Sequence, residues 1–189
     1  MALYHFSVRH VSRGKGQMVV ASAAYISGQR IFDSYYNKIH DYTSKSGVIF
    51  TEILTPEYVP ERLTDRETLW NEVEHVERNN KAQLAYSFDI ALQNELTLEE
   101  NIRLAKEFCQ EQFVARGMIV DLAVHEGKSD NEEEPDNPHF HVLVPIRPFT
   151  EEGIWGNKQR REYILDEDGN RVKDAKGKDM FNAVSTTGW

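Results

Sequence analysis

Three histidines in the second half of the 189-residue chain have the residue type and the spacing of metal ligands. His139 and His141 lie two residues apart, and alternate side chains of a strand point to the same face. His125 ends an earlier apolar run, so antiparallel pairing of the two strands would bring it beside the pair. Three neutral imidazoles at one point are typical of a divalent metal site with positions left open for substrate.

The same spacing is equally typical of a polar sheet face with satisfied histidines, so the histidines by themselves leave both interpretations open. A cupin-type metal site is disfavoured, because no glutamate stands among the residues that follow the pair, Leu143 to Ile146.

A metal that polarises a phosphodiester still requires a nucleophile, which is either water or a side chain that becomes covalently attached. Tyr25 is the candidate side chain, because it lies one turn before Gly28 in a segment, 17–29, that has a helical pattern. A phosphotyrosyl ester would retain the energy of the broken phosphodiester for later rejoining. The alternative interpretation is that Tyr25 packs among the neighbouring alanines.

The composition bounds the class of protein. With 40% hydrophobic and 28% charged residues, 189 residues suit one compact domain. No signal peptide or membrane-spanning run is visible, so we expect no membrane insertion. The single cysteine, Cys109, is expected to pack in a helix and fits a reducing cytoplasm.

The net charge of −9 argues against nucleic-acid binding, but the charge is unevenly distributed. Residues 1–45 carry six basic side chains against two acidic ones, so a basic face remains compatible with an acidic protein. Scattered surface charge is the alternative for each of these side chains. The candidate DNA contacts are Arg9, Arg13, Lys15, Arg30, Tyr42, Lys158, Arg160 and Arg161.

The pattern of elements predicts an α+β fold, with a mostly antiparallel sheet and helices packed against it. Strands are expected at 4–10, 84–92, 118–125 and 139–146, and helices at 17–29, 65–79 and 97–116. Residues 31–54 suggest hairpins that turn at Asn37-Lys38 and at Ser46-Gly47. We expect a catalytic domain over 1–149, with 150–189 as its partly ordered extension, and a longer protein beyond it.

Three stretches together resemble the MobA/MobL family of mobilisation relaxases, within the His-hydrophobe-His single-strand nucleases. They are Tyr4-His5-Phe6-Ser7 with Arg13-Gly14-Lys15-Gly16, Ala21-Ser22-Ala23-Ala24-Tyr25-Ile26-Ser27-Gly28, and Asp136-Asn137-Pro138-His139-Phe140-His141-Val142. The resemblance covers nearly the whole chain in order. It implies a five-stranded antiparallel sheet like that of replication initiators, in the relaxase domain of a larger plasmid or mobile-element protein.

Carried over residue by residue, the resemblance implies that Tyr25 is the nucleophile and that His125, His139 and His141 hold the metal. Glu74 falls where the family has an acidic residue close to the site, so it would orient a histidine or accept the tyrosine proton. On sequence alone, Glu74 fits a solvated helix face with Glu72 and Glu77 at least as well.

The implied reaction is a metal-assisted transesterification that nicks one strand at a transfer origin and leaves a 5′-phosphotyrosyl bond and a free 3′-OH. Mn²⁺ or Mg²⁺ is the expected metal, with Zn²⁺ or Ni²⁺ as alternatives. The implied partners are single-stranded DNA, accessory mobilisation proteins and a coupling protein.

Two features depart from the family pattern. The segment 126–138 is long and acidic, which argues against direct contact with DNA, and the loop 13–16 is unusually rich in glycine. Three other functions stay open: a replication initiator nuclease, a phosphodiesterase that uses water, and a non-catalytic module that binds single-stranded DNA.

Overall fold

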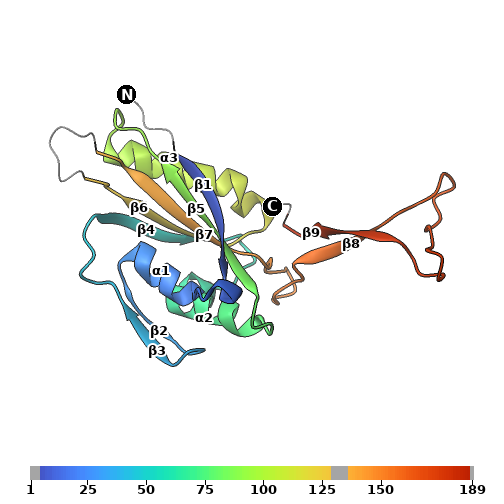
Figure 1. Cartoon of the computed structure of the whole chain (residues 1–189). Coiled ribbons are helices and arrows are strands. Elements are labelled where there is room, and N and C mark those ends of the chain that lie inside the picture. Colours follow the sequence, from blue (N-terminus) through green and yellow to red (C-terminus); the bar gives the residue numbers. More distant parts are fainter. Residues whose placement is uncertain (1–4, 129–135, 188–189) are drawn as a thin grey trace.

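A five-stranded antiparallel sheet forms the centre of the molecule, with the strand order β1-β5-β7-β6-β4 (Figure 1). This computed structural model describes residues 5–128 and 136–187. The predicted α+β class and the predicted five-stranded sheet are confirmed. The strands are β1 (Phe6–Ser12), β4 (Val48–Leu54), β5 (Gln83–Ala91), β6 (Val120–His125) and β7 (His139–Pro145).

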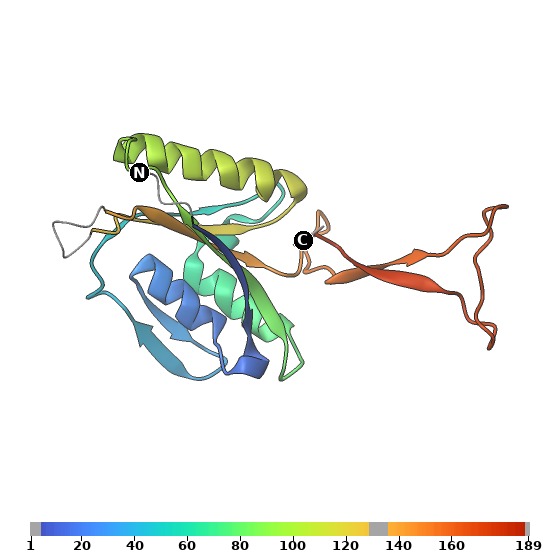
Figure 2. The ribbon, with the colours of Figure 1, turned by 45° about the horizontal axis from the view of Figure 1, so that its top comes forward.

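Helices cover both faces of this sheet. Figure 2 shows α1 (Val19–Ser27) and α2 (Arg66–Val76) on one face and α3 (Leu98–Gln112) on the other. Three short 3-10 turns, η1 (Arg13–Lys15), η2 (Glu61–Thr64) and η3 (Val114–Arg116), lie in the connections. None of the helices in the described ranges combines the length and apolar character that a membrane crossing requires.

The helix ends follow the capping signals of the sequence. The Asp65 side chain accepts the backbone N–H of Thr68 at the start of α2, and Thr97 and Glu100 form a capping box at the start of α3. Gly28 ends α1 in the left-handed region, with φ 64°, which a residue with a Cβ rarely adopts.

The alternating side chains of the strands divide the interior into two cores. Val142 and Val144 of β7 pack with Phe113 and Cys109 beneath α3, whereas Leu143 packs with Trp70 beneath α1 and α2. Burial raises the pKa of the Cys109 thiol to about 12, so this cysteine is a core residue, as the sequence indicates.

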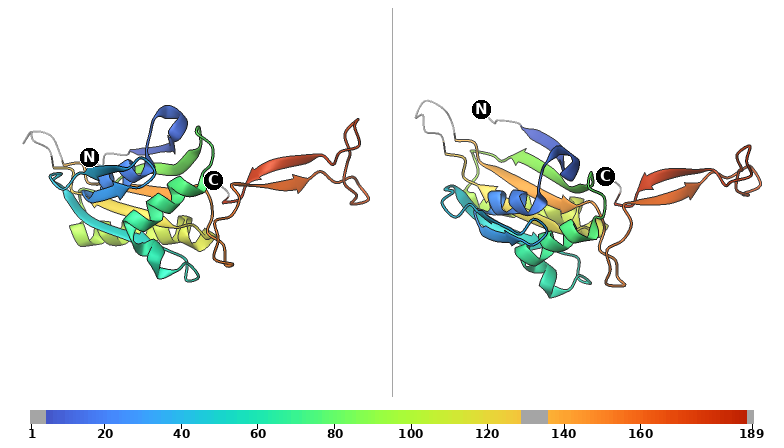
Figure 3. Two further views of the ribbon diagram at one scale, coloured as in Figure 1. Left: turned by 90° about the horizontal axis from the view of Figure 1, so that it is seen from below. Right: turned by 60° about the horizontal axis from the view of Figure 1, so that its bottom comes forward.

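Two ribbons lie outside the main sheet. The first, β2 (Arg30–Asp33) with β3 (Lys38–Asp41), is the predicted hairpin around Asn37. The second, β8 (Gln159–Tyr163) with β9 (Phe181–Ser185), extends away from the sheet as an arm in both views of Figure 3.

The second predicted hairpin, at Ser46-Gly47, is wrong, because β4 does not pair with β3 but joins the edge of the main sheet beside β6. The physical reason is that β4 carries apolar side chains on both faces. Phe50 packs in the α3 core and Ile53 packs in the α1/α2 core, which a two-stranded ribbon could not cover.

A buried ion pair between Arg66 and Asp121 connects α2 to strand β6 of the sheet. Arg66 of α2 donates from Nε and Nη2 to the carboxylate of Asp121 in β6, and the Trp70 Nε1 donates to the same carboxylate at 2.7 Å. Burial raises the pKa of Asp121, and the adjacent Arg66 opposes that rise. Asp121 lies on the same face of β6 as His125, four residues on, so the ion pair also fixes the strand that carries this histidine.

Arg66→Ala is expected to reduce the free energy of unfolding by about 3–5 kcal/mol, because it leaves the buried Asp121 carboxylate without its counter-charge. Urea denaturation would measure the change. The matched control is Arg103→Ala, which removes an exposed i,i+4 pair with Glu107 and should cost no more than about 0.5 kcal/mol. Equal losses for the two variants would contradict this role of the buried pair.

Candidate active site

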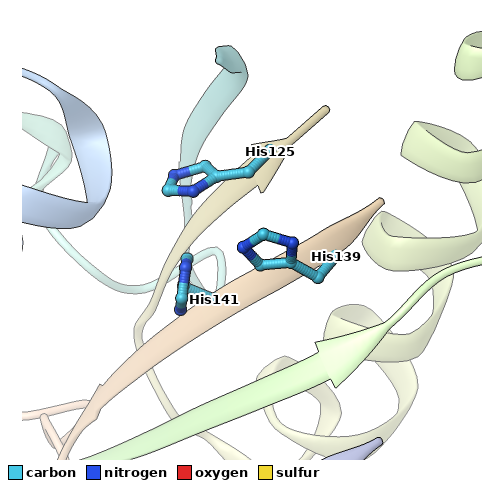
Figure 4. A group of neighbouring side chains, drawn as sticks. All are labelled: His125, His139 and His141. Carbon is cyan, nitrogen blue, oxygen red and sulfur yellow. The ribbon is translucent and has the colours of Figure 1, made fainter. Parts of the chain in front are cut away.

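The three histidines lie together where β6 and β7 pair. His125 stands directly opposite His139, and His141 stands opposite Ala123, so all three side chains share the face covered by α1 and α2. Figure 4 shows the rings turned toward one another from the two strands. One ligand nitrogen from each ring lies within 4.8 Å of the others. The cluster predicted from the spacing therefore forms.

Backbone carbonyls orient two of the rings. His125 Nε2 donates to the Ile26 carbonyl at 2.7 Å, and His139 Nδ1 donates to the Asn137 carbonyl at 2.7 Å. Since a carbonyl can only accept, these bonds assign the proton on each ring and leave His125 Nδ1 and His139 Nε2 with free lone pairs. Burial lowers the pKa of His125 to about 4 and also lowers that of His139, which favours the neutral ligand form.

The third ring is held by a carboxylate that sequence reasoning missed. Asp89 stands opposite His141 in the β5–β7 pairing, and its carboxylate accepts from His141 Nδ1, which leaves His141 Nε2 free. This bond, more than the neighbouring Arg9, lowers the pKa of Asp89 to about 2. The only signal in the sequence was an acidic residue within the otherwise apolar end of a strand.

The donor set therefore fits a divalent metal. His125, His139 and His141 each offer one unprotonated nitrogen, and each ring is fixed through its other nitrogen, which is how proteins orient metal-binding histidines. Three nitrogen ligands would leave further positions open. Imidazole ligands of this kind suit several divalent metals.

Tyr25, on α1, lines the same cavity as this cluster. Its side chain is 49% exposed, whereas Ala23, Ala24 and Ile26 around it are buried, so the alternative that it packs among alanines does not hold. The Tyr25 ring meets Tyr42 edge to face, with 5.4 Å between centroids. The next residue in the chain, Ile26, is the one whose carbonyl orients His125, so α1 positions the phenol and one imidazole together.

Two open cavities meet at Tyr25 and His141. One, of about 460 Å³, contains Tyr25, Lys45 and the three histidines along its wall. The other, of about 400 Å³, continues past Arg9, Tyr42 and Asp89. An extended chain could therefore pass over the three histidines and the phenol in one groove.

Comparison with known proteins assigns the chain to a family. The model of the MobA/MobL family matches residues 17–188. The chain belongs to the MobA/MobL family. This confirms the resemblance inferred from the sequence motifs.

Several proteins of related sequence carry names from conjugation and mobilisation. The chain is 35% identical to the conjugal transfer protein TraA of Agrobacterium fabrum over 96% of its own length and 16% of that protein. It is 36% identical to the probable mobilization protein MobA of Bifidobacterium longum, over 91% of this chain and 30% of that one. The chain thus spans a minor part of these relatives.

A solved structure shares the fold. It is described as the molecular basis of vancomycin resistance transfer in Staphylococcus aureus, and it superposes with a TM-score of 0.76 at 38% sequence identity. The match covers 84% of this chain and 78% of the other.

Glu74 and Arg13 bind each other in the interior of the protein, which the sequence pattern does not indicate. Glu74 is fully buried: its Oε2 accepts from Arg13 Nη2 at 2.6 Å, and its Oε1 accepts the Val19 N–H at 3.0 Å. Both oxygens are thus bound away from the histidines, and the solvated-face alternative is wrong for Glu74. Because α1 has no side-chain cap of its own, Glu74 caps the helix that carries Tyr25.

Arg13 is buried as well, which argues against its expected contact with phosphate. Its guanidinium donates to the carbonyls of Glu74, Glu77 and Asn79, and it lies 4.3 Å from the centre of the Tyr35 ring. These bonds tie the end of β1 to the end of α2.

The other expected DNA contacts are divided between the groove and distant surfaces. Arg9 and Tyr42 line the groove. Arg30 pairs loosely with Asp41 on the β2–β3 ribbon, and Lys15 is exposed in η1. Lys158 pairs with the buried Glu77 at the base of the arm, at 3.0 Å.

The two arginines of β8 contact other residues of the arm. Arg160 pairs with Glu162, and Arg161 lies over the Phe181 ring. The acidic run Glu132 to Glu134, expected to avoid DNA, lies outside the described residues.

Gly127 is a second feature that the sequence did not single out. It has φ 60°, and a Cβ there would lie 1.8 Å from the Asn137 carbonyl oxygen, the same atom that orients His139. The Asn137 N–H in turn donates to the Gly127 carbonyl at 2.8 Å. The Asn137 backbone must therefore lie close to Gly127 for its carbonyl to orient the His139 ring.

Gly127→Ala is expected to weaken Mn²⁺ binding at least tenfold, because the methyl group must displace the carbonyl that orients His139. Isothermal titration calorimetry would measure the affinity. Gly153→Ala is the matched control: Gly153 also has a positive φ, 80°, but no atom lies within 4 Å of its would-be Cβ. Equal affinities for the two variants would show that the Gly127–Asn137 contact does not support the site.

Proposed function

We propose that this chain is the DNA-nicking domain of a mobilisation relaxase. It would cleave one strand at a transfer origin in the cytoplasm, with Tyr25 as nucleophile, and keep the 5′ end as a phosphotyrosyl ester. One observation carries the proposal: an exposed phenol borders the same cavity as three imidazole nitrogens with free lone pairs.

The proposed reaction is a transesterification at one phosphodiester. The Tyr25 oxygen forms a bond to phosphorus, the bond from phosphorus to the 3′-oxygen breaks, and the strand ends in a free 3′-OH. The phenol loses its proton and the departing 3′-oxygen gains one, so no cofactor is consumed. Attack by the 3′-OH reverses the reaction and restores the strand.

His125, His139 and His141 would hold the divalent metal, with Mn²⁺ or Mg²⁺ as the proposed ion. Bound there, it would supply Lewis-acid polarisation of a phosphate oxygen. Asp89 would keep the His141 ring and its tautomer fixed, and Arg9, which pairs with Asp89 at the mouth of the groove, would attract the strand.

The names of the relatives support the biological setting. Conjugal transfer and mobilisation proteins from several bacteria are 32–36% identical to this chain over the matched residues. We propose single-stranded DNA of a transfer origin as the substrate, and accessory mobilisation proteins and a coupling protein as partners. Tyr42, on the groove wall, would offer a ring on which a base stacks.

A covalent trap tests the proposal. The protein is incubated with Mn²⁺ and single-stranded fragments of a candidate origin, denatured in detergent, and digested for mass spectrometry. We expect a nucleotide adduct on Tyr25 that is lost with chelator and in Tyr25→Phe. Tyr36→Phe, a control at an exposed tyrosine of the β2–β3 ribbon, should retain the adduct.

The other products would contradict the proposal in distinct ways. Metal-dependent cleavage without an adduct, unchanged in Tyr25→Phe, would identify a phosphodiesterase that uses water. DNA binding without cleavage, indifferent to chelator, would identify a non-catalytic binding module. An adduct at an origin of replication alone would identify a replication initiator.

A further inference from the structure

The loop between β3 and β4 joins the two halves of the site. Its first residue, Tyr42, donates its N–H to the Gln29 carbonyl just past α1, at 3.1 Å. At its other end, the Gly47 carbonyl accepts the N–H of Glu126, the residue after His125, at 2.9 Å. The loop is therefore fixed both to the helix of Tyr25 and to the strand of His125.

Lys45 of this loop contacts Tyr25 in two ways. Its Nζ donates to the Tyr25 backbone carbonyl at 3.1 Å and lies 3.6 Å from the centre of the Tyr25 ring. This ammonium–ring distance is well within the range of a cation–π contact. Lys45 lines the same cavity as Tyr25 and the three histidines.

Among the described residues, the Lys45 ammonium has no anionic partner, whereas three other lysines each pair with a glutamate. Lys106, Lys128 and Lys158 pair with Glu52, Glu126 and Glu77. Within the described ranges, no carboxylate lies within ion-pair distance of Lys45.

Burial of the half-buried Lys45 side chain lowers the pKa of its ammonium group, because water is removed without an anion to replace it. A phosphate entering the cavity would supply that missing counter-charge. An ammonium has three donors, and the Tyr25 carbonyl takes only one of them.

We infer that Lys45 is a phosphate-binding residue of the site, which contacts a phosphodiester of single-stranded DNA while its side chain holds the Tyr25 ring in place. The inference rests on the proposed function, since it takes the DNA strand as the occupant of the cavity. A phosphate held there by Lys45 would lie beside the phenol that attacks it.

Salt-dependent DNA binding tests the inference without requiring cleavage. Fluorescence anisotropy with a mixed-sequence single-stranded DNA, in the presence of Mn²⁺, gives the slope of log affinity against log salt concentration. Lys45→Met should lower the magnitude of this slope by about 0.7, the contribution of one phosphate contact on single strands. Lys45→Arg, which keeps the positive charge, should keep the slope of the unmodified protein.

The matched control is Lys106→Met. Lys106 is also a lysine near an aromatic ring, 5.7 Å from the centre of Phe50, but it lies on α3, on the opposite face of the sheet. We expect Lys106→Met to leave the slope unchanged. An unchanged slope in Lys45→Met, or an equal fall in both variants, would overturn the inference.

Amine acetylation of the unmodified protein provides a second test, which does not depend on how the variants fold. Mass spectrometry should show at least a threefold slower acetylation of Lys45 when the single-stranded DNA is present. Unprotected Lys45 would overturn the inference. Both Lys45 tests measure DNA binding and do not require cleavage. A missing Tyr25 adduct would therefore contradict the proposed nicking reaction but would not decide whether Lys45 binds phosphate.

Discussion

The antiparallel pairing of β6 with β7 is the constraint on which the candidate site depends. Its register sets His125 opposite His139, and the two-residue period of a strand then returns His141 to the same face. A shift of one residue would turn the imidazoles of one strand toward the α3 core. Gly127 and Asn137 hold the ends of the two strands together, directly beside the histidines.

Helix α2 connects the strand that carries His125 to the helix that carries Tyr25. Its Arg66 binds Asp121 on the strand of His125, and its Glu74 caps α1, which presents Tyr25. Glu77, just past its end, pairs with Arg147 and Lys158 at the base of the arm. Buried charges that a sequence reading places on a solvated face therefore connect the sheet, the Tyr25 helix and the arm.

Local signals made much of the fold predictable. Caps at Asp65 and Thr97, the glycine after α1 and the spacing of His139 and His141 act over a few residues, and the structure confirms each of them. The roles of other residues depend on pairings across tens of residues. Asp89 meets His141 only because β5 lies beside β7, and nothing near either residue encodes that neighbour.

The same distinction explains the expectations that failed. Arg13 and Glu74 look like surface charges in isolation, but they neutralise each other in the interior, 61 residues apart in the chain. Strand β4 follows β3 directly yet pairs with β6, because apolar side chains on both of its faces need two cores. No local pattern indicates a role for Lys45, because the proposed role depends on its contact with Tyr25, 20 residues earlier in the chain.

The central claim is that three imidazoles hold one divalent metal beside Tyr25. Anomalous diffraction from crystals soaked in Mn²⁺ tests this claim most directly. We expect one strong peak bounded by His125 Nδ1, His139 Nε2 and His141 Nε2, next to the Tyr25 phenol, and its loss in His139→Ala. A site without a peak, or a peak bound mainly by carboxylates elsewhere, would contradict it.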